Sequence, residues 1–101
     1  MGRYTVSDKA ASDLAEIEDG HVRRGGSQEN ADLLILGFLK SFQNLADYPD
    51  IGTPRDYLRE GELAIPHGNY MIVYTQRTAQ LVDILHVVWG SIELEGYFSD
   101  A

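Results

Sequence analysis

Residues 70–89 read YMIVYTQRTAQLVDILHVVW and contain two runs rich in β-branched and aromatic side chains. That composition is typical of β-strands. Only residues 76–80 separate the first run, Tyr70–Thr75, from the second, Leu81–Trp89, and so short a connection excludes a parallel crossover. We therefore predict an antiparallel pair. Both runs are apolar at both parities, which indicates central strands covered on two faces.

A third strand is predicted just before this pair. Residues 63–65 read Leu-Ala-Ile, and the short connection at residues 67–69 suits another antiparallel hairpin. The three runs then form a meander. Upstream, Pro49 and Pro54 lie in a turn-rich segment, because each proline keeps the preceding residue out of helical geometry. This segment separates the helical periodicity before it from the strand pattern after it.

The N-terminal half has the periodicity of two helices. Residues 3–7 alternate polar and apolar side chains, which predicts a short first strand. Ser7 then suits the N-cap of a helix that ends around Arg24. Gly25 and Gly26 break this helix, and Ser27 suits the N-cap of a second. The apolar positions of the second helix recur at helical spacing: Ala31, Leu34, Ile35, Phe38, Leu39, Phe42 and Leu45.

Together these elements predict an α+β fold. An N-terminal strand and an antiparallel helical hairpin pack on a C-terminal antiparallel sheet, in a single domain spanning residues 1–101. The 101 residues, 44% of them hydrophobic, suffice for one core and are too few for two ordinary domains.

Charge and composition exclude several classes of function. The formal net charge of -8 opposes direct binding of nucleic acid, although Arg23-Arg24 and the pair Arg55 and Arg59 could form local basic patches. The chain has no cysteine, so it has neither disulfides nor thiolate metal sites. No targeting segment or membrane span is evident, and we expect a soluble, cytoplasmic protein without membrane contact.

The sequence contains few residues arranged for catalysis. The three histidines fall in three different elements, so we predict no metal site, and no glycine-rich loop suggests a nucleotide or other cofactor. His86 shares a strand face with Ile84 and Val88 in this reading, and it is either a general acid or base or a half-buried packing residue. Tyr70 and Tyr74 share a face and are either packing or recognition residues.

Several segments together resemble a known family. They are Tyr48-Pro49-Asp50-Ile51-Gly52-Thr53-Pro54-Arg55, the residues Gly61 and Pro66, Gly68-Asn69-Tyr70-Met71-Ile72-Val73-Tyr74, and Ile84-Leu85-His86-Val87-Val88-Trp89-Gly90. This combination is similar to the ParE/RelE toxin superfamily of type II toxin–antitoxin systems, and closest to ParE. The similarity runs from Tyr4 to Gly90 and implies the same strand, hairpin and sheet.

The chain departs from the family pattern at two charged positions. Leu63 stands where the family usually has arginine, and Trp89-Gly90-Ser91-Ile92 stands where it commonly has His-Gly-Ala-Arg. The resemblance therefore implies no catalytic residues and favours a non-enzymatic toxin that inhibits DNA gyrase by binding. Two alternatives stay open: a RelE-like ribosome-dependent messenger RNA endonuclease, and a decayed toxin that only binds antitoxin.

A ParE-like toxin implies two partners, and we assign candidate residues to each. The gyrase-binding candidates are Arg55, Arg59, Trp89, Tyr97 and Phe98. The candidates for contact with a ParD-like antitoxin, in a hetero-oligomeric complex, are Leu14, Ile17, Leu34, Phe38 and Tyr74.

Overall fold

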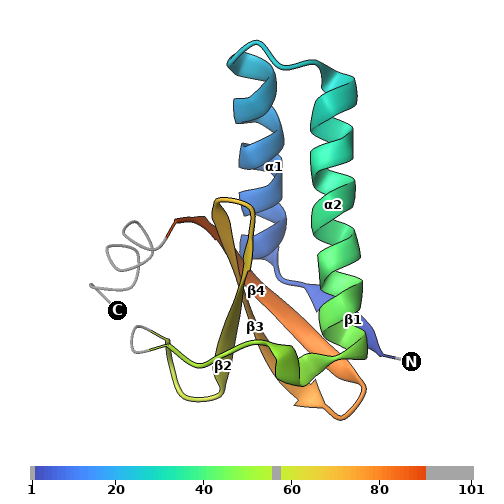
Figure 1. Ribbon diagram of the computed structural model, residues 1–101, viewed down its shortest axis with the longest axis vertical. Helices are drawn as coiled ribbons and strands as arrows, with labels where there is room; N and C mark the ends of the chain where they lie inside the picture. The colour runs from blue at the N-terminus through green and yellow to red at the C-terminus, as the bar shows by residue number, and fades with distance from the viewer. Residues whose placement is uncertain (1, 56–57, 91–101) are drawn as a thin grey trace.

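The computed structural model describes residues 2–55 and 58–90 (Figure 1). Two helices form a hairpin that stands on a four-stranded sheet. The helices are α1 (Asp8–Arg23) and α2 (Gln28–Asp47), followed by the 3-10 turn η1 (Pro49–Ile51). The strands are β1 (Arg3–Val6), β2 (Glu62–His67), β3 (Tyr70–Thr78) and β4 (Leu81–Trp89).

Both helices begin at the predicted serines. The Ser7 hydroxyl accepts the Ala10 N–H at 3.0 Å, and the Ser27 hydroxyl accepts the Asn30 N–H at 3.0 Å. Each bond satisfies a backbone donor that the first helical turn leaves without a partner. Between the helices, Gly25 adopts a φ of 94°, which a residue with a Cβ rarely does. These local signals explain why the hairpin was predictable.

The sheet has the order β1-β4-β3-β2. Strand β3 pairs antiparallel with β2 and β4, which confirms the predicted meander, whereas β1 lies parallel to β4 at the edge. A parallel neighbour needs a long crossover, and the hairpin together with β2 and β3 forms that connection. The α+β architecture is thus as predicted, with a mixed sheet.

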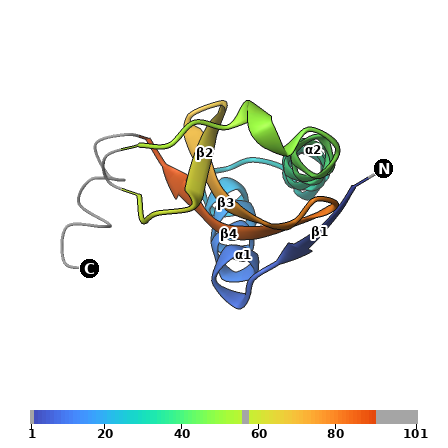
Figure 2. The same ribbon diagram turned by 90° about the horizontal axis from the view of Figure 1, so that it is seen from below.

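Two clusters of apolar side chains bury the two faces of the sheet. The helix-facing cluster contains Phe38, Phe42 and Leu45 from α2 together with sheet residues such as Ile72 and Ile84. Figure 2 shows α2 to one side of β3 and α1 behind β4 in this view. The cluster of the opposite face contains Ala64, Met71, Val73 and Val88, with Leu58 and Leu85 packed against it.

A β-bulge in β4 corrects the predicted face of His86. Val73 pairs with His86 and Tyr74 with Ile84, so Leu85 is an extra residue in β4. A bulge shifts the alternation of side chains by one. As a result Ile84 belongs to the helix-facing cluster and Val88 to the opposite one, and the predicted shared face of Ile84, His86 and Val88 is wrong.

The hydroxyl of Tyr74 ties the segment after α2 to the sheet. It donates to the Pro49 carbonyl at 2.6 Å and accepts the Gly52 N–H at 2.9 Å. A Cβ at Gly52 would lie 2.4 Å from that hydroxyl oxygen, so only glycine fits. Burial raises the pKa of Tyr74, which keeps the phenol protonated and able to donate.

We expect Tyr74→Phe to lower the free energy of unfolding by about 1–3 kcal/mol, because it leaves two backbone groups without their partner. Urea denaturation monitored by circular dichroism measures the change. The control is Tyr48→Phe, at a side chain that is 63% exposed, which should shift stability by less than about 0.5 kcal/mol. Equal effects of the two substitutions would contradict the structural role of the Tyr74 hydroxyl.

Candidate partner-binding site

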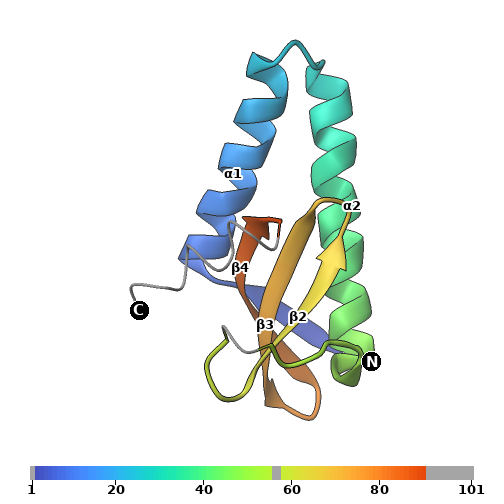
Figure 3. The same ribbon diagram turned by 60° about the vertical axis from the view of Figure 1, so that its left-hand side comes forward.

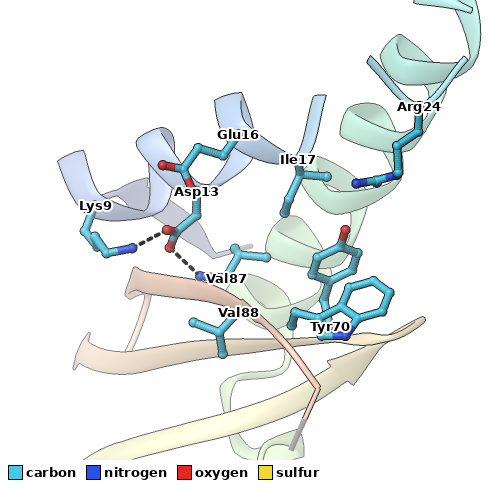
Figure 4. A pocket seen from close by; sticks show the side chains of 9 residues that line it. Lys9, Asp13, Glu16, Ile17, Arg24, Tyr70, Val87 and Val88 are labelled. Atoms are coloured by element: carbon cyan, nitrogen blue, oxygen red, sulfur yellow. Dashed lines mark hydrogen bonds and ion pairs between the residues drawn. The ribbon is translucent and has the colours of Figure 1, made fainter. Parts of the chain in front are cut away.

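A cleft of about 380 Å³ opens between α1 and the ends of β3 and β4 (Figure 4). Its size is within the range of ligand-binding pockets. The residues that line it are Lys9, Asp13, Glu16, Ile17, Arg24, Tyr70, Val87, Val88 and Trp89.

Two aromatic rings form one wall of the cleft. Tyr70 and Trp89 meet edge to face, with ring centroids 5.0 Å apart and planes at 85°. Tyr70 is held from behind by Phe38, whose ring centroid lies 5.5 Å away. Trp89 nevertheless keeps 47% of its surface exposed, and it is the only tryptophan of the chain. A supported aromatic pair with a solvent-exposed indole is typical of a binding surface.

The opposite wall is the polar face of α1. Asp13 is only 7% exposed, and its carboxylate accepts the Val87 N–H at 2.9 Å while it pairs with the Lys9 ammonium. Because β1 ends at Val6, the edge of β4 has no strand partner at Val87, and the Asp13 side chain takes that position. Asp13 is therefore structural.

Two charged side chains of this cleft, Glu16 and Arg24, form no ion pair with any other described residue. Arg24, the C-cap residue of α1, follows Glu16 by eight positions, which corresponds to about 12 Å of helical rise. In Figure 4 the Arg24 guanidinium extends toward Tyr70, and Glu16 lies next to Asp13. The cleft thus has an anionic end, a cationic end and an aromatic wall.

The antitoxin-contact candidates differ in accessibility. Ile17 lines the cleft, and Leu14 and Leu34 are partly buried against the core. Phe38 and Tyr74 have no exposed surface, so their side chains pack within this chain and offer nothing to a partner in this conformation. Their helical and strand periodicity identified them equally well as core residues.

The gyrase-binding candidates do not come together in one place. Trp89 lies in the cleft, whereas Arg55 and Arg59 are exposed on the segment before β2 and do not line it. Tyr97 and Phe98 lie outside the described residues. Glu16 and Arg24 also line the cleft and were not predicted as site residues. Their helical spacing from Asp13 and Ile17 places all four residues on one helix face, and this spacing could have identified them from the sequence.

The residues that an RNA endonuclease would use are largely engaged in structural contacts. Tyr74 is buried with its hydroxyl bonded, and Arg77 pairs with Asp83 at 2.8 Å. Burial lowers the pKa of the half-buried His86, although Asp13 and Glu62 act in the opposite direction. Within residues 2–55 and 58–90, no three side chains of His, Asp or Glu gather as a metal site.

No helix in the described ranges is long and apolar enough to span a bilayer.

Comparison with solved structures finds the same fold in another chain. The structure matches a chain described as the chromosomal ParDE toxin–antitoxin system from P. aeruginosa, with a TM-score of 0.75. The match covers 90% of this chain and 98% of that one at 19% sequence identity. No curated protein sequence matches the chain.

The family model of the ParE toxin of the type II toxin–antitoxin system, parDE, matches residues 4–92. The chain belongs to the ParE toxin family.

We expect Asp13→Ala to lower the free energy of unfolding by about 2 kcal/mol, because the buried Val87 N–H loses a charged acceptor. Chemical denaturation provides the measurement. Asp19→Ala is the matched control, since Asp19 pairs with Arg23 at 2.8 Å on the exposed surface of the same helix, and its loss should cost about 0.5 kcal/mol. A loss at Asp13 no larger than at Asp19 would show that the edge contact is dispensable.

Acid should weaken the attachment of β2 to α2. The His67 ring lies 4.4 Å from the Phe38 ring, its Nδ1 is 2.7 Å from the Ser41 hydroxyl, and burial lowers its pKa from 6.5. Near and below pH 6.5 the unfolded chain then binds more protons than the folded one, so stability decreases as the pH is lowered. Unfolding midpoints at about pH 7.5 and about pH 5.5 should show this decline. The decline should be smaller in His67→Gln.

Proposed function

We propose that the chain is a toxin that inhibits DNA gyrase by binding and is neutralised by a ParD-like antitoxin. The family match over residues 4–92 carries this proposal. A toxin of this kind acts in the cytoplasm, where its target lies, and stabilises the inheritance of the plasmid or other replicon that encodes the pair.

The character of the cleft supports binding over catalysis. Trp89 and Tyr70 offer an apolar aromatic surface, and aromatic side chains are enriched among the residues that dominate protein interfaces. By contrast, the Tyr74 hydroxyl and the Arg77 guanidinium already have partners within the chain. An RNA-cleaving site needs a free acid or base and cations to stabilise a charged phosphorane.

Target contact extends, in this proposal, to the segment before β2. Arg55 and Arg59 are exposed there and lie outside the cleft, so they are accessible to a large partner such as gyrase. The overall charge of -8 makes such local cations the natural points of attraction for an acidic surface. Leu14, Ile17 and Leu34 remain the proposed antitoxin contacts on the hairpin.

Expression without the antitoxin should arrest growth and induce the DNA damage response, and co-expression of the antitoxin should restore growth. The purified toxin should inhibit supercoiling by gyrase at micromolar concentration. Normal supercoiling together with messenger RNA cut at ribosomal A-site codons would identify an endonuclease instead. Antitoxin binding without growth arrest would identify a decayed toxin.

The double variant Arg55→Glu/Arg59→Glu should weaken gyrase inhibition at least about tenfold, because charge reversal at an interface replaces attraction by repulsion. Lys40→Glu is the control, as Lys40 is an exposed cation on α2. Inhibition constants from supercoiling assays, with thermal unfolding to verify folding, provide the comparison. Unchanged inhibition by the double variant would remove these arginines from the target contact.

A further inference from the structure

The exposure of Trp89 follows from the shape of the hairpin. In Figures 1 and 3 the turn between α1 and α2 projects well beyond the sheet, so the last turns of α1 stand away from the strands. Ile17 marks the last buried position of α1, and the cleft begins there. Trp89 ends β4 on the side of this open space. The described part of the fold therefore leaves Trp89 partly uncovered at the end of β4.

The charges beside this surface are arranged asymmetrically. Arg24 and Glu16 line the cleft without an ion pair among the described residues, whereas the adjacent Arg23 is paired with Asp19. An apolar surface between one cation and one anion complements a chain segment with the reverse order of charges. A polyanion or a uniformly apolar surface would complement this arrangement of charges less well.

We propose that the cleft receives one segment of the antitoxin, in which an apolar side chain packs on Trp89 and Tyr70. An acidic side chain of the same segment faces Arg24, and a basic one faces Glu16. The identity of the occupant rests on the function proposed above. A cleft of about 380 Å³ suits a peptide segment, and a groove that holds alternate anchors is a recurrent mode of peptide recognition.

The occupant would also cover Trp89, which is a candidate for target contact. A single segment then neutralises the toxin by shielding that indole, without any rearrangement of the core. Tyr70 is already fixed by Phe38, so the aromatic wall is formed before binding.

The single tryptophan makes the proposal directly testable. A tryptophan-free form of the ParD-type antitoxin is titrated into the full-length toxin, while Trp89 emission and its quenching by acrylamide are recorded. Occupation of the cleft should shift the emission to shorter wavelength and reduce the quenching constant severalfold. A complex in which Trp89 stays as quenchable as in the free toxin overturns the proposal.

Charge reversal tests the orientation of the segment. Arg24→Glu should weaken antitoxin binding at least about tenfold in calorimetry, whereas Arg23→Glu, with the same charge change one residue away, should leave the dissociation constant within about twofold. Equal effects of both variants would also overturn the proposal. Thermal unfolding verifies that both variants fold.

Growth assays separate this proposal from the proposed function. If the toxin arrests growth and binds the antitoxin while Trp89 stays accessible, only the assignment of the cleft fails. If the toxin neither arrests growth nor binds the antitoxin, the proposed function fails first.

Discussion

The contact between the Asp13 carboxylate and the Val87 N–H joins the two halves of this fold. Before it, β1 pairs with β4 through four registered positions, and the Ser7 N–H then continues the pairing by donating to the Ile84 carbonyl at 3.0 Å. The Ser7 hydroxyl also donates to the Leu85 carbonyl at 2.8 Å. Asp13 makes the next contact, six residues or about 1.7 helical turns later. The edge of β4 is thus covered successively by a strand, a helix cap and a helix side chain.

This sequence of contacts sets the position of α1 and so creates the cleft. With Asp13 held against β4 and Ile17 packed in the core, the remaining turns of α1 extend beyond the sheet. Arg24 and Trp89 then line the same cleft, although they lie 65 positions apart in the sequence (89 − 24). The position of α1 therefore both covers the edge of β4 and forms one wall of the cleft.

Local signals made most of the secondary structure predictable. Ser7, Ser27 and Gly25 act within a few residues, and each has the predicted effect on the backbone. Long-range features were not predictable. The parallel pairing of β1 depends on Leu81–Ile84, which are far from it in the sequence. The bulge at Leu85 shifts the alternation of side chains in β4, and no glycine or proline in β4 indicates it.

The site was harder to predict for a related reason. Phe38 and Tyr74 are apolar at regular spacing, and periodicity does not distinguish a core face from a binding face. Trp89 was identified because it ends a strand, but its exposure depends on the position of the last turns of α1 relative to the sheet. Arg24 looked like one half of a basic dipeptide. Only the structure separates it from Arg23, which has an ion-pair partner.

The parallel pairing of β1 and β4 also has a consequence for synthesis. Thr5 pairs with Asp83, and their side chains are hydrogen bonded across 78 residues of sequence. Contacts so distant in sequence form late, because closing a long loop costs entropy before the contact can compensate. On the ribosome, β1 must wait until β4 has emerged. The completed sheet, and with it the surface around Trp89, therefore appears only after β4 (Leu81–Trp89) has been translated.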